Sequence, residues 1–307
     1  MQRQVFGRVF SVFVALCLLS VSLLSSCKRH AVGEQVRVAV TTSIVCDVVR
    51  EVGGDDVTVT MLFPFGADPH TFEPTPMEMA ALFGTQTVFV NGGGLEAFID
   101  PLLESVGVPI VSVSDGISLR TFAPGSDEQG TDPHVWFDPA NLIIWAENIA
   151  RTLARLDPEH EDGYVSGALR YEQTLRDLDA WIASEVATIP QESRTLVTDH
   201  EDFAYFASRY GFELVSAVIP SSSTLVEPSA QGLATLEAAI RDRGVRAVFA
   251  GTTVNPILAE QVAKDTGIRI EFLYTGALTA PGGPASTYLE LMRYDVQTII
   301  RALTAGP

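Results

Sequence analysis

The chain has 307 residues, 47% of them hydrophobic, which is enough for a packed core and excludes a globally disordered protein. Its formal net charge of −18 argues against nucleic acid or an anionic membrane face as the main partner. Beyond residue 27 only one cysteine remains, Cys46, so the folded part has no internal disulfide. The apolar neighbours of Cys46 predict a buried core thiol.

The N-terminus has the layout of a secretory signal. Arg3 and Arg8 precede an apolar run over residues 9–24, which is shorter than the ~20 residues of a comfortable transmembrane helix. The run ends at Ser25-Ser26-Cys27, which resembles a bacterial lipobox. We therefore expect residues 1–27 to be a lipoprotein signal with Cys27 lipidated, followed by a polar tether over 28–35. The alternatives are an ordinary cleaved signal with a chance cysteine and an uncleaved membrane anchor.

Strand and helix patterns alternate from residue 36 onward, which favours parallel sheets covered by helices. Asp157-Pro158 interrupts this pattern, because proline cannot continue a helix. A helical stretch over 159–187 follows, longer than the usual globular helix of about 11–12 residues. Before it we expect strands at 36–40, 57–62, 87–91 and 110–113 and helices at 44–52, 76–83, 95–106 and 139–156.

The alternation resumes after the long helix. We therefore expect an α/β fold with an N-terminal lobe over residues 36–157, a linking helix within 158–190 and a C-terminal lobe over 191–307. In the last part, strands are expected at 195–197, 213–218, 247–250 and 268–273 and helices at 203–210, 230–243, 258–266 and 287–303.

Three of the five histidines follow predicted strands. His70 and His134 each end an Asp-Pro-His tripeptide, in which proline stiffens the loop ahead of a helix. His200 follows the strand at 195–197. Ligands of α/β sheets bind outside the carboxyl ends of strands. The other two, His30 in the tether and His160 in a charged helix start, are expected to be solvated.

Imidazole suits zinc, copper, iron and nickel, so His70, His134 and His200 could form a transition-metal site between the lobes. On spacing alone, three unrelated polar or capping histidines are an equal alternative. Asp68 and Asp132 either hydrogen-bond the histidine rings or cap the turns ahead of their prolines. The run Asn91-Gly92-Gly93-Gly94 lacks the Lys and Ser/Thr of a phosphate-binding loop and indicates a strand-to-helix turn.

The chain resembles the zinc- and manganese-specific solute-binding proteins of ABC importers, the ZnuA/TroA-like family. The resemblance runs from Val36 nearly to the C-terminus. It implies two α/β lobes joined by one long rigid helix, with a metal in the cleft between them. Its motifs are Thr41-Thr42-Ser43-Ile44-Val45, Asp68-Pro69-His70 with Glu73-Pro74, Asp132-Pro133-His134-Val135-Trp136, His200 with Phe203 and Tyr205-Phe206, Glu227-Pro228-Ser229-Ala230 and Pro281-Gly282-Gly283-Pro284-Ala285-Ser286-Thr287-Tyr288.

The resemblance implies metal ligation by His70, His134 and His200, and a histidine at the third position implies zinc rather than manganese. Two acids that the family usually carries appear here as Gly276 and Gly251. Three neutral imidazoles then leave the dication uncompensated. Water, hydroxide or another acid could complete the site, and the candidate acids are Glu227, Asp202 and Glu201.

We expect a lipid-anchored, monomeric, extracytoplasmic protein of the periplasm or cell surface. It is not an enzyme; it would carry Zn²⁺ to the permease of an ABC importer, without binding nucleic acid. The alternatives are a manganese or iron carrier, an adhesin-like relative that has lost its metal, and an exported zinc hydrolase, since three histidines and an open position also occur in catalytic zinc sites. No residue stands out as the general base that a hydrolase needs.

Overall fold

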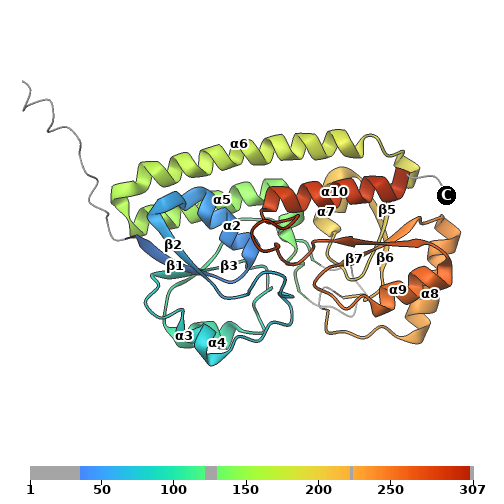
Figure 1. Cartoon of the computed structure of the whole chain (residues 1–307), viewed down its shortest axis with the longest axis horizontal. Coiled ribbons are helices and arrows are strands. Elements are labelled where there is room, and N and C mark those ends of the chain that lie inside the picture. The colour runs from blue at the N-terminus through green and yellow to red at the C-terminus, as the bar shows by residue number, and fades with distance from the viewer. Residues whose placement is uncertain (1–34, 122–129, 222–223, 305–307) are drawn as a thin grey trace, which may run out of the picture. The chain divides into compact units, whose positions relative to one another are not determined.

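The computed structural model describes residues 35–121, 130–221 and 224–304 (Figure 1). The expected signal, Cys27, His30 and nearly all of the tether lie outside these ranges. From Val36 onward the chain forms one compact unit. Within the described ranges, no helix has both the length and the apolar character that crossing a membrane requires.

The N-terminal lobe is built on four parallel strands in the order β2-β1-β3-β4. β1 pairs with β2 on one side and with β3 on the other, so the strand order reverses between β1 and β3. A crevice at the carboxyl ends of the strands is expected at such a point. The strands are β1 (Val36–Val40), β2 (Val57–Met61), β3 (Thr87–Val90) and β4 (Ile110–Ser112).

The C-terminal lobe repeats this plan with the order β6-β5-β7-β8, all parallel. Here the order reverses between β5 and β7, where Thr198 pairs with Phe249. Asp199 and His200 follow the end of β5, and Gly251 ends β7. The strands are β5 (Thr195–Thr198), β6 (Glu213–Ala217), β7 (Ala247–Gly251) and β8 (Arg269–Leu273).

One hydrophobic core extends through both lobes. It includes Val38 of β1, Trp145 of α5, Phe206 of α7 and Met292 of α10. Smaller clusters lie around Leu62 and the α4 side of the first sheet, and between the second sheet and α8 and α9. The helices of the two lobes are α2 (Ser43–Gly53), α3 (Pro76–Ala80), α4 (Asp100–Val106), α5 (Pro139–Leu156), α7 (Ala204–Tyr210), α8 (Ala230–Arg243), α9 (Ile257–Thr266) and α10 (Tyr288–Thr304).

The long helix is α6 (Glu161–Val186), which packs against α5, α2 and α10. Figure 1 shows it running along both lobes on the side of α5 and α10. These features confirm the expected α/β fold of two parallel-sheet lobes with a long joining helix. Short 3₁₀ turns accompany the regular elements at η1 (Gly54–Asp56), η2 (Val135–Phe137), η3 (Pro158–His160) and η4 (Gln191–Ser193).

Polar caps set the helix starts. Thr42 accepts a hydrogen bond from the Val45 N–H at the start of α2, and Asp138 accepts one from the Ala140 N–H ahead of Pro139 in α5. Two expected helix boundaries differ from the structure: the helix expected from residue 95 begins only at Asp100, and the helix expected over 76–83 ends at Ala80. The glycines at 92–94 all have positive φ, and the chain makes irregular turns before the helix forms.

Candidate metal centre

The structure brings together the three histidines that the sequence singled out. His70 follows β2, His134 precedes η2 after β4, and His200 follows β5, so two lobes contribute to one cluster. Their ring nitrogens lie within 4.8 Å of one another. His70 Nε2 and His134 Nε2 are 3.1 Å apart. Two nitrogens on one tetrahedral zinc ion, at 2.0–2.1 Å each, would be roughly 3.3 Å apart.

Carboxylates fix which nitrogen of two rings faces the cluster. Asp132 Oδ1 lies 2.8 Å from His134 Nδ1, and Asp199 Oδ1 lies 2.7 Å from His200 Nδ1. In each pair the Nδ1–H donates, which leaves Nε2 as the nitrogen that can act as a metal ligand. Both carboxylates and both imidazoles are buried. Two of the three imidazoles are therefore oriented with Nε2 toward the cluster.

The two Asp-Pro-His aspartates act differently. Asp132 Oδ1 accepts the His134 backbone N–H at 3.0 Å as well as the ring N–H, so it caps its turn and orients the ring. Asp68 Oδ1 accepts the His70 backbone N–H at 2.9 Å. Its other oxygen accepts the Thr224 hydroxyl at 2.6 Å, which ties this loop to the C-terminal lobe.

His70 and His200 lie in different electrostatic environments, and their pKa values shift in opposite directions. Burial and the neighbouring His134 and His200 rings hold the pKa of His70 well below its usual value. Burial also lowers the pKa of His200, but Asp202 and Asp199 more than offset this and raise it above the usual value. Burial raises the pKa of Asp202. His70 is thus poised as a neutral donor, whereas His200 lies in a negative environment.

Positions 276 and 251, where the family usually carries acids, hold glycines that are closely packed by their neighbours. A Cβ atom on Gly276 would lie 2.8 Å from Pro69 Cδ, next to His70. A Cβ atom on Gly251 would lie 2.4 Å from Thr275 Oγ1 and 3.2 Å from Asp199 Oδ2. Both glycines therefore allow another group to approach closely. Asp199 was not identified from the sequence as the residue that orients the His200 ring. In the sequence, Asp199 is only one acid after a predicted strand.

None of the three candidate fourth ligands joins the triad in the described part of the chain, although Asp202 forms a second possible metal-binding group with Asp199 and His200. Asp202 lies on the Nδ1 side of His200, at 3.8 Å. Glu201 is half-buried and Glu227 is exposed. A cation at the triad would thus have imidazole donors from the protein.

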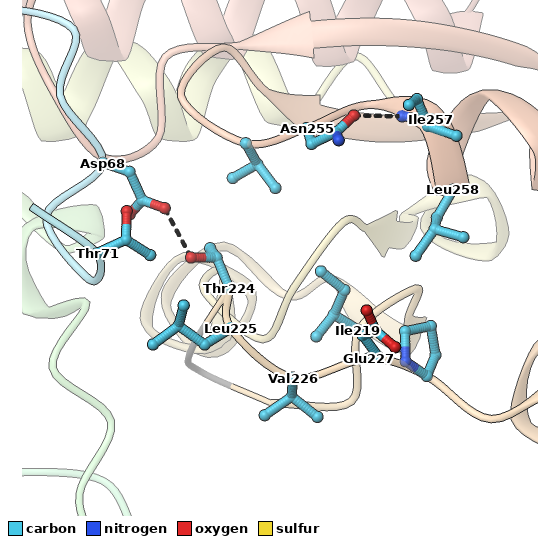
Figure 2. Close-up of a pocket in the computed structure, with 12 residues that line it drawn as sticks. Asp68, Thr71, Ile219, Thr224, Leu225, Val226, Glu227, Asn255, Ile257 and Leu258 are labelled. Carbon is cyan, nitrogen blue, oxygen red and sulfur yellow. Dashed lines mark hydrogen bonds between the residues drawn. The ribbon is translucent and has the colours of Figure 1, made fainter.

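Glu227 instead lines a separate pocket of about 620 Å³. Figure 2 shows this pocket between the Asp68 and Thr71 loop and the C-terminal segments around Leu225 and Ile257. The Asp68–Thr224 hydrogen bond crosses its edge. The histidines are not among its lining residues. The pocket adjoins the loop that carries His70 without containing the metal centre.

Further hydrogen bonds join the lobes around the cluster. Trp136 Nε1 donates to the Thr275 carbonyl at 3.0 Å, and the Leu278 N–H donates to Ser43 Oγ at 2.8 Å. The Tyr205 hydroxyl donates to the Asp132 carbonyl at 3.1 Å and accepts the Arg120 N–H at 2.9 Å. Trp136 is thus a buried core residue and also a bridge between lobes.

Two other expectations concern residues away from the cluster. Cys46 is buried as expected, and burial raises the pKa of its thiol to about 11. His160 is half-buried rather than fully solvated, and its Nδ1 lies 2.6 Å from Asp157 Oδ2. Neither group contacts the cluster.

A family model described as "Zinc-uptake complex component A periplasmic" (ZnuA) matches residues 38–302. The manganese-binding lipoprotein MntA of Halalkalibacterium halodurans is 33% identical, over 89% of this chain and 90% of its own. The iron-binding protein YfeA of Yersinia pestis is 29% identical, over 95% of this chain and 94% of its own.

Among solved structures, the periplasmic zinc-binding protein TroA from Treponema pallidum superposes with a TM-score of 0.82 and 26% identity, covering 88% of this chain and 100% of its own. These relatives carry different metals in their names, each is matched over 90% or more of its own length, and TroA shares the fold. The chain therefore belongs to the ZnuA family, as a non-enzymatic solute-binding protein that serves divalent-metal import by an ABC transporter.

Proposed function

We propose that the protein captures Zn²⁺ with the Nε2 atoms of His70, His134 and His200 and delivers it, as a monomer, to the permease of its importer. The observation that carries the proposal is that one ring nitrogen from each of the three histidines lies within 4.8 Å of the other two. Two of these rings are oriented by aspartates. Such carboxylate–histidine pairs are typical of zinc ligands.

The donor set favours zinc over manganese. Imidazole suits zinc, whereas carboxylate, carbonyl and water oxygens suit manganese. In the described part of the chain the triad contains no carboxylate ligand. Manganese and iron are the alternative cargoes, because relatives are named for binding them. A zinc ion would complete its four-coordinate shell with water, hydroxide or an acid that moves on binding.

The test is calorimetric titration of the metal-free protein with Zn²⁺ and with Mn²⁺, beside the variant His200→Ala. We expect one tight zinc site, much weaker manganese binding, and loss of the tight site in the variant. Tighter binding of manganese would overturn the choice of metal. Binding of neither metal would overturn the carrier function and favour an interaction role.

We also propose that residues 1–27 are a lipoprotein signal, with Cys27 as the lipidated first residue of the mature chain, and that 28–35 tether the metal-binding part to the extracytoplasmic face of the membrane. The support is the Ser25-Ser26-Cys27 motif and the lipoprotein relatives. The wild-type protein should incorporate labelled fatty acid, and the variant Cys27→Ser should not. Equal labelling of both proteins, or of neither, would contradict the lipid anchor.

A further inference from the structure

We propose that Asp199 is the positioning residue for His200 and that Gly251 is a glycine because the Thr275 hydroxyl and the Asp199 carboxylate occupy the space beside it. This inference rests on the proposed function, in which His200 binds the metal. It assigns the control of metal affinity to a contact between the ends of β5 and β7. Asp199 would act through His200, without touching the cation.

The hydrogen bonds of Asp199 use both carboxylate oxygens. Oδ1 lies 2.7 Å from His200 Nδ1, and Oδ2 accepts the Gly251 N–H at 2.6 Å. Asp199 is 3% exposed. The Gly251 N–H thus fixes the carboxylate, and the carboxylate fixes the imidazole. The ring is left with Nε2 as its only free nitrogen, and the negative charge behind it strengthens the ring as a donor.

The space around Gly251 supports the same pairing. Any side chain there would bring its Cβ to 3.2 Å from Asp199 Oδ2 and 2.4 Å from Thr275 Oγ1. The φ angle of Gly251 is not positive, so its backbone does not demand glycine. Close approach of the two side chains is the reason that remains for a glycine at this position.

The charge of Asp199 is a second reason to expect that its contact with His200 affects metal affinity. Three neutral imidazoles leave a bound dication with its full charge in a buried site, which is costly without nearby negative groups. Asp199 supplies such a group in a fixed place. Asp202 is a second acid on the same side of His200, 3.8 Å from Nδ1, and neither of its oxygens has a hydrogen-bond partner in the described residues. Asp202 is therefore near the ring but does not hold it.

This difference provides a matched pair of variants. Asp199→Asn removes the charge, and its amide can accept only one of the two N–H donors, because its other end is an NH₂ group. Asp202→Asn replaces the second acid beside the ring and removes no hydrogen bond to His200. Zinc affinity of the purified protein, measured by competition with a chromophoric chelator, should fall about 10–100-fold for Asp199→Asn. It should fall clearly less for Asp202→Asn.

A rescue separates orientation of His200 from general structural damage. Asp199→Ala opens space beside Gly251, and Thr275→Ala removes the hydroxyl that a Cβ there would meet. Adding Gly251→Asp in that background returns a carboxylate to the vacated space. The triple variant should bind zinc more tightly than Asp199→Ala/Thr275→Ala and approach the Thr275→Ala control. Thermal unfolding of each metal-free variant establishes that it is folded.

The outcomes are distinguishable. Equal losses for Asp199→Asn and Asp202→Asn, or wild-type affinity in Asp199→Asn while His200→Ala still abolishes binding, would overturn the positioning role and leave the carrier function intact. A folded triple variant without recovery would also overturn it. Absence of zinc binding in the wild type would overturn the proposed function, and this inference with it.

Discussion

At the scale of single residues, Glu96 is a buried carboxyl at the point where the N-terminal strand order reverses. It accepts hydrogen bonds from the Thr41 hydroxyl at 2.7 Å and from the Asn91 and Gly92 N–H groups at 2.7 and 3.0 Å. Asn91 in turn donates to the Pro133 carbonyl, beside His134. Glu96 therefore braces the loop that presents one histidine.

The titration of Glu96 yields the first prediction. Burial raises its pKa from 4.5 to about 7. Between these values the folded protein holds a proton that the unfolded chain has released, so this group lowers stability as pH rises from about 4.5 to about 7. The loss is at most roughly 3 kcal/mol. Urea unfolding of the metal-free protein at pH 5 and pH 7.5 should show a steeper fall for the wild type than for Glu96→Gln. Parallel curves would contradict the assignment.

Gly276 yields the second prediction. Because a Cβ atom there would meet Pro69 Cδ at 2.8 Å and Thr253 Oγ1 at 3.1 Å, Gly276→Ala should displace the loop that carries His70. We expect weaker zinc binding and a loss of about 1–3 kcal/mol in the free energy of unfolding, as for other overpacked sites. Calorimetry and urea unfolding measure the two effects. Wild-type values for the zinc affinity and for the free energy of unfolding would show that the loop moves aside without loss of stability.

The sequence alone predicted that His70, His134 and His200 come together, but not which residues hold them in place. His70 and His134 stood out because Asp-Pro-His occurs twice and each copy follows a strand pattern. Asp199 could not be recognised, because its meaning depends on Gly251, a residue 52 positions away in the chain. Glu96 looked like an ordinary polar helix residue, yet three hydrogen bonds compensate its burial. Such pairings arise from the way parallel strands bring distant loops together, and no local pattern records them.

At the scale of elements, two glycines of α6 form a matched pair for the third prediction. A Cβ atom on Gly167 would lie 2.3 Å from the Val52 carbonyl oxygen of α2, whereas one on Gly163 would meet only Asp56 Oδ2 at 4.0 Å. Gly163→Ala should stabilise the protein by about 0.5–1 kcal/mol through helix propensity. Gly167→Ala should destabilise it despite the same propensity gain, because α2 and α6 must separate. Urea unfolding of both variants provides the measurement, and equal effects would contradict the close α2–α6 approach.

Most elements were predictable because strands and helices differ in hydrophobic period. The helix at 230–243 has the expected bounds, and the long helix was visible from its spaced apolar residues after Pro158. The start of α4 was not predictable in this way. Apolar Leu95 and Ile99 fit a helical period, but they are buried within irregular turns before the helix begins at Asp100. Burial of Leu95 and Ile99 in these turns gives the same spacing of apolar residues as a helix.

At the scale of the whole molecule, the division into two lobes does not divide the core. Trp136 and Val38 belong to the same buried cluster as Phe249 of the C-terminal sheet and Tyr288 of α10. The Tyr288 hydroxyl donates to the Trp136 carbonyl at 2.7 Å, and its backbone N–H donates to Asp47 Oδ2 at 2.9 Å. The last helix thus ties the C-terminal lobe to the first.

This continuity predicts that the metal-free lobes unfold together. Far-UV circular dichroism and tryptophan fluorescence should give coincident transitions, the usual sign of two-state behaviour. Tyr288→Phe leaves the buried Trp136 carbonyl without its donor, so it should lower the free energy of unfolding by about 1–3 kcal/mol. If the core is shared, that loss moves one transition to lower temperature without splitting it. Two transitions in the wild type, or a variant in which only one lobe melts early, would mean that each lobe is stable alone and that α10 merely lies against its neighbour.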